Sequence, residues 1–286
     1  MPELPQVQAL VDFLAERAVG LAVAGVELGS ISVLKTYDPP PQALLGAPID
    51  AVRRHGKFLD LDCDGTHLVF HLARAGWLRW SEQLPATVIR PGKSPIALRV
   101  RLSDGSGFDL TEAGTKKSLA AYLVREVREV PGVARLGPDP LAPEFTRAVF
   151  GGLLAGRRTQ IKGLLRDQAV IAGVGNAYSD EILHVARMSP FALAATLAEA
   201  DIDRLYAALR DTLAGAVAAA SGKPAAELKD AKRAGMRVHG RTGATCPECG
   251  DVVREVSFAD SALQYCATCQ TGGKPLADRR MSRLLK

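Results

Sequence analysis

No stretch of the sequence approaches the roughly 18 uninterrupted apolar residues that a membrane-spanning helix needs, so we expect no membrane partner. The opening residues MPELPQVQ lack a basic segment followed by an apolar run, which excludes the usual pattern of a secretory signal peptide. We therefore expect a cytoplasmic protein. Aromatic residues are few, at 5%, but the apolar share of 47% and the charged share of 23% are those of a soluble globular protein. A disordered or fibrous chain is excluded on that composition.

Cysteine is also scarce, with five residues in the chain of 286. Four of them form two Cys-x-x-Cys pairs near the C-terminus, Cys246 with Cys249 and Cys266 with Cys269. In a cytoplasmic chain this usage indicates a metal site before a disulfide. Four thiolates in a closed tetrahedral arrangement hold structural zinc, so we predict one Zn²⁺ per chain, with a β-hairpin between the two pairs. Chance thiols or a redox pair are the alternative, and Cys63 is expected to be a reduced strand residue.

The charge of the chain favours a polyanionic partner. The formal net charge is +5 and the sequence pI is about 9.0. Many basic proteins never bind nucleic acid, so this observation alone does not decide the partner.

Apolar periodicity predicts the order of the elements. Residues 4–18 carry apolar side chains at helical spacing and are followed by Gly20, which is a stop signal. From about residue 22 to 110 the pattern has a period of two, as expected of strands. Asp64-Gly65 separates two such runs, 58–63 and 66–72, and this dipeptide favours the type I′ turn of a β-hairpin.

The second half of the chain is predicted to have a different structure from the first. A proline-rich segment at 131–143 is expected to link an N-terminal β domain at 1–130 to a helical domain at 144–222. Residues 238–286 are expected to form the cysteine finger with a basic tail. The length of 286 residues allows this number of folded parts.

Three short motifs carry candidate chemistry. The turn Gly173–Asn176 predicts a helix start with Asn176 as N-cap, and helix N-termini bind phosphate, although an ordinary tight turn is the plain alternative. Removal of the initiator methionine would expose Pro2 as a secondary amine that can attack a sugar aldehyde carbon, beside the Glu3 carboxylate. Lys57 follows Gly56 at the head of a strand, where most lysines are merely solvated.

Taken together, these residues resemble the formamidopyrimidine-DNA glycosylase and endonuclease VIII family along nearly the whole chain. The matching segments, in order, are Met1–Pro5, Gly56–Leu59, Arg135–Leu141, Ile161–Lys162, Val174–Tyr178, His239–Arg241 and the four-cysteine finger. Each motif is modest, whereas their order and spacing are specific.

The resemblance implies an α+β multidomain fold. It consists of an N-terminal β-sandwich with an N-terminal helix, a helix-two-turn-helix α domain and a C-terminal zinc-finger β-hairpin. The implied activity is base-excision repair by a bifunctional DNA glycosylase and AP lyase. The implied partner is double-stranded DNA that contains damaged bases or abasic sites, which would place a monomeric enzyme on the nucleoid.

The resemblance also implies roles for single residues. Pro2 is implied as the nucleophile at the deoxyribose C1′ and Glu3 as the proton shuttle, while Lys57 is implied to hold the phosphate of the lesion nucleotide. Lys162 and Asn176 are implied to bind neighbouring phosphates. Arg74 occupies the position of the methionine that fills the space left by a flipped base.

The sequence departs from the family pattern at several positions. Gln6 stands where a glutamate is usual, and Ser261 stands where the finger usually has an arginine. The segment 112–117 offers no clear match for the arginine and phenylalanine that assist the void-filling methionine. The interval between 230 and 238 is too short for the loop that caps 8-oxoguanine. These departures favour the endonuclease VIII side, with oxidised pyrimidines or abasic sites as substrates, or a divergent paralogue of the family.

Two other functions compete with this interpretation. A non-catalytic or weakly catalytic lesion-binding paralogue would explain Gln6 and the missing void-filling residues, but not the presence of Pro2, Glu3 and Lys57 together. A zinc-ribbon transcription or RNA factor would explain the charge and the finger, but not the N-terminal motif.

Overall fold

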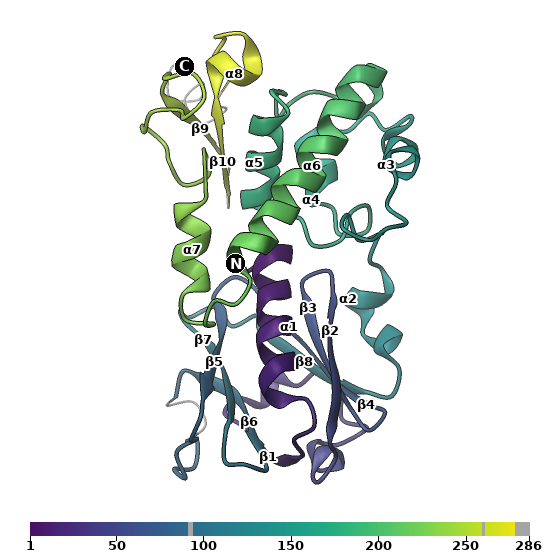
Figure 1. The fold of residues 1–286 in the computed structure, drawn as a ribbon, viewed down its shortest axis with the longest axis vertical. Helices are drawn as coiled ribbons and strands as arrows, with labels where there is room; N and C mark the ends of the chain where they lie inside the picture. The colour runs from purple at the N-terminus through teal and green to yellow at the C-terminus, as the bar shows by residue number, and fades with distance from the viewer. Residues whose placement is uncertain (91–93, 259–260, 278–286) are drawn as a thin grey trace. The chain divides into compact units, whose positions relative to one another are not determined.

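The structure, a computed structural model, describes residues 1–90, 94–258 and 261–277 (Figure 1). Its internal contacts divide the chain into two compact units, which are described separately. The first unit contains residues 1–136 and 220–229, and the second contains residues 137–219 and 230–286. None of the helices described is both long enough and apolar enough to cross a membrane.

The first unit is a sandwich of two antiparallel sheets beside an N-terminal helix, α1 (Leu4–Ala18). One sheet has the order β1 (Val23–Leu28), β6 (Ile96–Leu102), β7 (Gly107–Glu112), β5 (Gly76–Ser81). The other has the order β2 (Ile49–His55), β3 (Phe58–Cys63), β4 (Thr66–His71), β8 (Ala120–Val124). The predicted N-terminal β-sandwich with its helix is confirmed. Short helical turns lie in its connections: η1 (Ile31–Val33), η2 (Pro41–Leu44), η3 (Val127–Glu129) and α2 (Pro131–Ala134).

Helix α1 forms where the apolar spacing predicts it. Leu4, Val7, Leu10 and Leu14 are buried in one row, and Gly20 has a φ of +86°, which a residue with a side chain rarely adopts. Burial of this row joins the helix to the same apolar core that the two sheets enclose.

The hairpin of β3 and β4 confirms the predicted turn. Asp64 and Gly65 have φ angles of 50° and 74°, the left-handed values that a type I′ turn requires at both central positions. Cys63, the last residue of β3, is a free and buried thiol, as expected. Burial raises the pKa of Cys63 to about 12, so this thiol is unreactive at neutral pH.

The outer face of the second sheet holds a buried carboxylate. Asp60 on β3 has an exposed fraction of 0%, and its two oxygens lie 3.0 Å from His55 Nε2 and 2.9 Å from His67 Nδ1. Since a buried charge is costly without partners, the two imidazoles stabilise Asp60 at this position.

Residues 220–229 return to the first unit. Ala225 and Leu228 are buried in the sandwich core, and Trp77 Nε1–H donates to the Ala225 carbonyl at 3.1 Å. The Lys229 ammonium lies 4.4 Å from the centre of the Trp77 ring, a cation–π contact.

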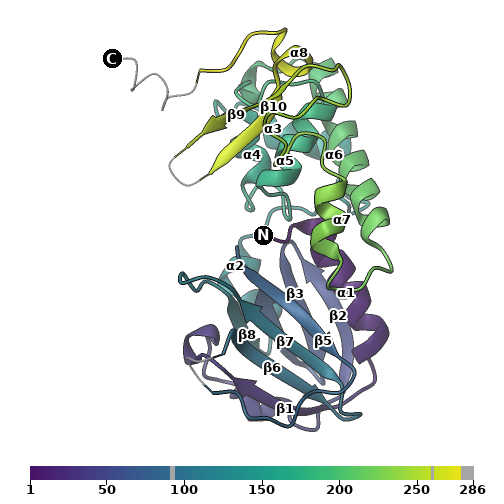
Figure 2. The same ribbon diagram turned by 90° about the vertical axis from the view of Figure 1, so that its left-hand side faces the viewer.

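The second unit is helical and ends in a small hairpin. Its helices are α3 (Arg147–Leu154), α4 (Ile161–Arg166), α5 (Asn176–Val185), η4 (Ala194–Thr196), most of α6 (Glu199–Ala220) and most of α7 (Leu228–Ala234). Strands β9 (Val253–Ser257) and β10 (Ala262–Cys266) form the antiparallel hairpin, and α8 (Ala267–Thr271) follows (Figure 2). The predicted helical domain and the predicted hairpin between the cysteine pairs are both confirmed.

Candidate active site and metal centre

The start of α1 positions the predicted nucleophile and proton shuttle. Pro2 and Glu3 are both buried, and Glu3 is the N-cap of the helix with an extended backbone. The Glu3 N–H donates to Gln6 Oε1 at 3.3 Å, while the Glu3 carboxylate accepts from the Gln6 backbone N–H, which completes a capping box. Gln6 therefore takes part in capping the first helix, and it is 2% exposed.

Lys57 lies in the two-residue turn between β2 and β3. Gly56, with a φ of +57°, allows the tight turn, and Lys57 is only 7% exposed, so it is not the solvated strand lysine that the sequence alone favoured. Arg54 joins this turn to the first helix, because its Nε donates to Gln8 Oε1 at 2.8 Å and its Nη1 donates to the Gly56 carbonyl at 3.3 Å.

His71 lies directly across the sheet from the start of β3. It pairs with Phe58, and the two rings have centroids 4.8 Å apart. Burial, together with the nearby positive charge of Lys57, lowers the pKa of His71 to about 4. The imidazole is therefore neutral near pH 7, and its Nδ1 accepts a hydrogen bond from the Ala73 N–H at 3.1 Å.

The same end of the sandwich carries Arg74. It follows Ala73, whose φ of 52° marks a strained turn, and its side chain is exposed. Because Phe58 and His71 are cross-strand partners, the turn after β4 lies beside the turn that holds Lys57. The structure thus brings Lys57 and Arg74 to one end of the first unit, and Arg54 ties the first helix to that end.

The segment 112–117 is organised by Glu112 at the end of β7. Its carboxylate is 3% exposed and accepts from the backbone N–H groups of Ser118 and Leu119 at 2.7 and 3.0 Å. Lys117 Nζ donates to the Glu112 carbonyl. Glu112 therefore closes this loop upon itself, at the position where the family pattern has its assisting residues.

The other two predicted phosphate-binding residues lie together in the second unit. Lys162 on α4 is 5% exposed and donates to Asp180 Oδ1 at 2.5 Å, to Ser179 Oγ at 2.8 Å and to the Asn176 carbonyl at 3.2 Å. These contacts join α4 to α5. The phosphate-binding role of Lys162 stays a prediction, and the geometry adds a structural role to it.

The prediction that Asn176 is an N-cap is wrong by one residue. Gly175 is the cap, with extended angles of φ −128° and ψ −157°, and Asn176 is the first helical residue. Its Nδ2 donates to the Ala262 carbonyl at 2.8 Å, which joins the helix start to the β9–β10 hairpin. The Asn176 side chain therefore bonds to the hairpin and does not cap the helix.

Two adjacent carboxylates of α5 fix the chain that leads into the cysteine finger. Asp180, which is fully buried, also accepts from His239 Nδ1 at 2.7 Å. Glu181 accepts from the backbone N–H groups of Arg237, Val238 and His239 at 2.7, 3.0 and 2.8 Å. These charge-assisted bonds hold residues 237–239 against the helix.

The four predicted metal ligands converge. The Sγ atoms of Cys246, Cys249, Cys266 and Cys269 all lie within 4.8 Å of one another, with 3.4 Å between Cys249 and Cys266 and 3.9 Å between Cys246 and Cys269. Zinc–sulfur bonds of about 2.3 Å in a tetrahedron place sulfurs about 3.8 Å apart. The cluster therefore fits a zinc ion, and the predicted convergence of these residues is confirmed.

The pKa values of the cysteine thiols indicate which protons a bound metal would have to displace. Burial raises the pKa of Cys266 to about 11 and also raises the pKa of Cys269. The backbone N–H of Asp251 lowers the pKa of the exposed Cys249. Since the buried thiols are protonated near pH 7 without a metal, metal binding must release protons, and its affinity must rise with pH.

The structure describes residues 261–277 of the finger and the start of the tail. Ser261 lies just before β10, and the Phe258 N–H donates to its carbonyl at 2.7 Å. Lys274 follows α8, and its backbone N–H donates to the Thr271 carbonyl. The other cations of the basic tail, namely Arg279, Arg280, Arg283 and Lys286, lie outside the described residues.

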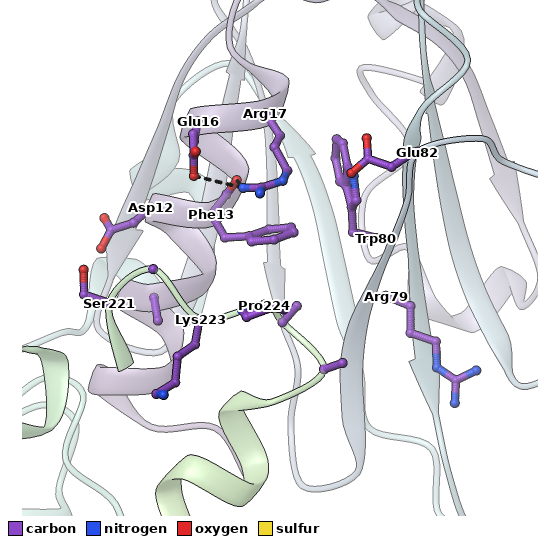
Figure 3. A pocket seen from close by; sticks show the side chains of 14 residues that line it. Asp12, Phe13, Glu16, Arg17, Arg79, Trp80, Glu82, Ser221, Lys223 and Pro224 are labelled. Atoms are coloured by element: carbon purple, nitrogen blue, oxygen red, sulfur yellow. Dashed lines mark hydrogen bonds and ion pairs between the residues drawn. The ribbon is translucent and has the colours of Figure 1, made fainter. Parts of the chain in front are cut away.

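A pocket of about 710 Å³ in the first unit lies between α1, β5 and the segment 221–226 (Figure 3). Phe13 and Trp80 meet edge to face with centroids 5.9 Å apart, and the Arg17 guanidinium lies 4.1 Å from the Phe13 ring. Its lining includes three acidic and three basic residues, namely Asp12, Glu16, Glu82, Arg17, Arg79 and Lys223. None of the predicted catalytic or DNA-binding residues lines this pocket, and its mixed charge indicates no particular ligand.

Sequence reasoning missed the polar stripe of α5. Asn176, Asp180 and His184 recur at intervals of four residues, so they share one face of the helix. This spacing was visible in the sequence, but polar residues at i, i+4 and i+8 of a helix are normally read as its solvated face. Here they are buried or half-buried against the chain around the cysteines.

Comparisons with known proteins agree with the geometry. The family profile of the formamidopyrimidine-DNA glycosylase N-terminal domain matches residues 1–117, and the profile of the family's H2TH domain matches residues 136–226. An uncharacterized formamidopyrimidine-DNA glycosylase-like protein of Mycobacterium tuberculosis is 58% identical over 156 residues, which are 54% of this chain and 98% of the relative. The formamidopyrimidine-DNA glycosylase of Symbiobacterium thermophilum is 35% identical over 98% of this chain and 93% of its own.

Solved structures show the same fold with DNA. The Lactococcus lactis formamidopyrimidine-DNA glycosylase, bound non-covalently to DNA that contains an abasic site, superposes with a TM-score of 0.81 at 25% identity. The match covers 94% of this chain and 99% of that one.

Proposed function

Because the chain belongs to the formamidopyrimidine-DNA glycosylase family, we propose that it is a bifunctional DNA glycosylase and AP lyase whose nucleophile is the nitrogen of Pro2. Its substrate is double-stranded DNA that contains a damaged base or an abasic site. Within this proposal, residues 1–130 form the catalytic domain, residues 144–222 the helix-two-turn-helix domain, and residues 238–286 the finger.

One observation carries the proposal. Pro2 and Glu3 lie buried at the start of α1, and Arg54 joins that helix to the turn that holds the buried Lys57. An amine, a carboxylate and a cation are the three groups that imine chemistry at a phosphorylated sugar needs. The Pro2 nitrogen is bonded to Met1 in the full chain, so the reaction requires that Met1 be removed first.

The proposed reaction begins with the neutral Pro2 amine attacking C1′ while the bond from C1′ to the damaged base breaks, and the proton that the amine then loses neutralises the departing base. Glu3 protonates the ring oxygen, the sugar opens, and an iminium forms between Pro2 and C1′. The iminium accepts electrons when a C2′ proton is lost, so the 3′ phosphate and then the 5′ phosphate can leave by elimination. Lys57 neutralises the phosphate of the lesion nucleotide.

The target nucleotide must leave the base stack before C1′ becomes accessible. Flipping costs a few kcal/mol, and contacts to the flanking phosphates offset part of that cost. In this proposal Lys162 and Asn176 supply such contacts from the second unit, and Arg74 occupies the space that the base vacates.

The cysteine cluster is proposed to hold one structural Zn²⁺. Cys246, Cys249, Cys266 and Cys269 close a four-coordinate site, which leaves no position for substrate. The ion would order the finger and take no part in the reaction at C1′.

Borohydride trapping on a duplex with an abasic site tests the proposal. We expect a covalent complex, and peptide mapping should place the adduct on Pro2. The matched control carries one extra residue before Pro2 that cannot be removed, and it should not be trapped. Trapping at a lysine, or equal trapping of the blocked control, would reject the assignment. DNA binding without any trapping would support the lesion-binding paralogue.

A further inference from the structure

His184 lies at the C-terminal end of α5, against the cysteine cluster. Its Nε2 is 3.3 Å from Cys246 Sγ, within hydrogen-bonding distance for sulfur, and the side chain is 1% exposed. We propose that the His184 Nε2–H donates a hydrogen bond to the Cys246 thiolate and thereby couples the helix α5 to the metal centre. The inference rests on the proposed zinc site and names a residue that acts on it.

The tautomer of His184 follows from the different surroundings of its two ring nitrogens. A metal-bound thiolate can only accept a hydrogen bond, so the nitrogen that faces Cys246 must carry a proton. The other nitrogen, Nδ1, is buried and has no partner among the described residues. A proton on Nδ1 would be a buried unsatisfied donor, and it would also place the Nε2 lone pair against the sulfur lone pairs. Protonation at Nε2 avoids both costs.

Cys246 receives from His184 what two other cysteines receive from the backbone. The backbone N–H of Asp251 favours the thiolate form of Cys249, and the backbone N–H of Cys269 favours the thiolate form of Cys266. Four thiolates around a divalent ion leave a net charge of −2, and each N–H donor stabilises part of that charge. His184 therefore completes on Cys246, from a different part of the chain, a pattern that the finger builds locally on Cys249 and Cys266.

The hydrogen bond has a mechanical consequence, because His184 shares a helix with Asn176, Asp180 and Glu181. Asn176 bonds to the carbonyl of Ala262 at the start of β10, and the two carboxylates hold residues 237–239. The finger thus docks on one face of α5 along the whole helix. Loss of the metal would leave Cys246 as a neutral thiol, which is a weaker acceptor than a thiolate, and would weaken the docking contact at the His184 end.

His184 is a positioning residue in this proposal and not a fifth ligand. The four sulfurs already satisfy the tetrahedral preference of zinc, so a fifth bond has no vacant position. Partners that hydrogen-bond to metal ligands typically change metal affinity by about 10- to 100-fold when they are removed. We expect that range for the loss of the His184 donor.

The direct test uses the full-length protein, labelled with ¹⁵N and loaded with ¹¹³Cd in place of zinc. Long-range ¹H–¹⁵N spectra should show His184 protonated on Nε2 and unprotonated on Nδ1. A ¹H–¹¹³Cd correlation to the Nε2 proton should appear through the Cys246 sulfur. Protonation on Nδ1, or a direct ¹⁵N–¹¹³Cd coupling that identifies His184 as a ligand, would overturn the proposal.

Variants supply an independent test. In His184→Phe the ring fills the site without a donor, and we expect the zinc-loaded protein to lose metal to a chelator about 10- to 100-fold faster. His184→Gln keeps an N–H donor, so its rate of metal loss should lie between those of His184→Phe and the wild type. His239→Phe is the matched control, because His239 bonds to Asp180 on the same helix and not to a thiolate.

The outcomes separate the two proposals. If His184→Phe and His239→Phe release zinc at the same rate, general loosening of the finger explains the effect and the His184 proposal is wrong. If wild-type protein binds neither zinc nor cadmium, the zinc site itself is wrong. If the His184 variants do not fold, the spectra of the wild-type cadmium protein still decide the question.

Discussion

Protonation of His71 should destabilise the first unit at mildly acidic pH. Its folded pKa of about 4 lies below the unfolded value of 6.5, chiefly because the imidazole is buried and also because Lys57 is near. As pH falls below 6.5 the unfolded chain therefore binds this proton first, and the folded chain binds it only near pH 4. The contribution is fully present above pH 6.5 and is lost as pH falls towards 4.

The size of the effect follows from the two pKa values. At about 1.4 kcal/mol for each pH unit, the interval from 6.5 to about 4 corresponds to about 3 to 4 kcal/mol of unfolding free energy. Most of it should be gone by pH 4.5. A loss of this size is a large part of the stability of an ordinary domain, which is roughly 5 to 15 kcal/mol.

Tryptophan fluorescence during urea denaturation measures this effect in the right part of the molecule. The chain has two tryptophans, Trp77 and Trp80, and both lie on β5 in the first unit. The matched variant is His71→Asn, whose side-chain oxygen can still accept from the Ala73 N–H but does not titrate. We expect the wild type to lose about 2 to 3 kcal/mol more than this variant between pH 7.5 and 4.5. Equal losses, or a folded-state NMR titration of His71 near 6.5, would refute the reasoning.

Four further predictions concern the reaction and the DNA. Gln6→Glu should increase the single-turnover rate of base release by at least about 10-fold, because a general acid or base typically contributes 10²- to 10⁴-fold. The same substitution should leave the rate of nicking at a preformed abasic site unchanged, and equal effects on both steps would contradict the prediction. Elemental analysis of freshly purified protein should find one zinc per chain, and Cys266→Ser should weaken DNA binding while the β-sandwich stays folded. Deletion of residues 274–286 should reduce the slope of log affinity against log salt, whereas an unchanged slope would remove the tail from the DNA contact. Thymine glycol should be excised faster than 8-oxoguanine opposite cytosine, since α7 and the short chain after it leave no room for a long capping loop.

Local signals in the sequence predicted local structure well. The first helix, the Asp64-Gly65 hairpin and the convergence of the cysteines were all predictable, because turn chemistry, apolar spacing and ligand spacing act over a few residues. The error at Asn176 has the same origin. A glycine and an asparagine in succession both suit a cap, and the contact of Asn176 with the distant carbonyl of Ala262 is not visible in the local sequence.

Contacts between distant segments were not predictable. Nothing near residues 220–229 indicates that Trp77 will donate to the carbonyl of Ala225 or that the Lys229 ammonium will lie over the Trp77 ring, since the partners are far apart in the chain. The burial of Lys162 was hidden for the same reason. Its acceptors, Asp180 among them, lie on the next helix. From the local sequence alone, a lysine that follows an isoleucine is predicted to be a surface residue.

Gln6 shows how a departure from a family pattern can be divided into a structural and a chemical part. Its oxygen accepts from the Glu3 N–H, and an amide and a carboxylate of the same length both provide that acceptor, so the cap is preserved with either residue. What the amide lacks is the ability to take up and return a proton near pH 7. Because the cap is common to both residues, a comparison of Gln6 with Gln6→Glu changes the proton chemistry at the start of α1 without removing the bond that orients Glu3. A difference confined to base release would therefore report on proton transfer during departure of the base, and no difference would show that position 6 serves only the helix.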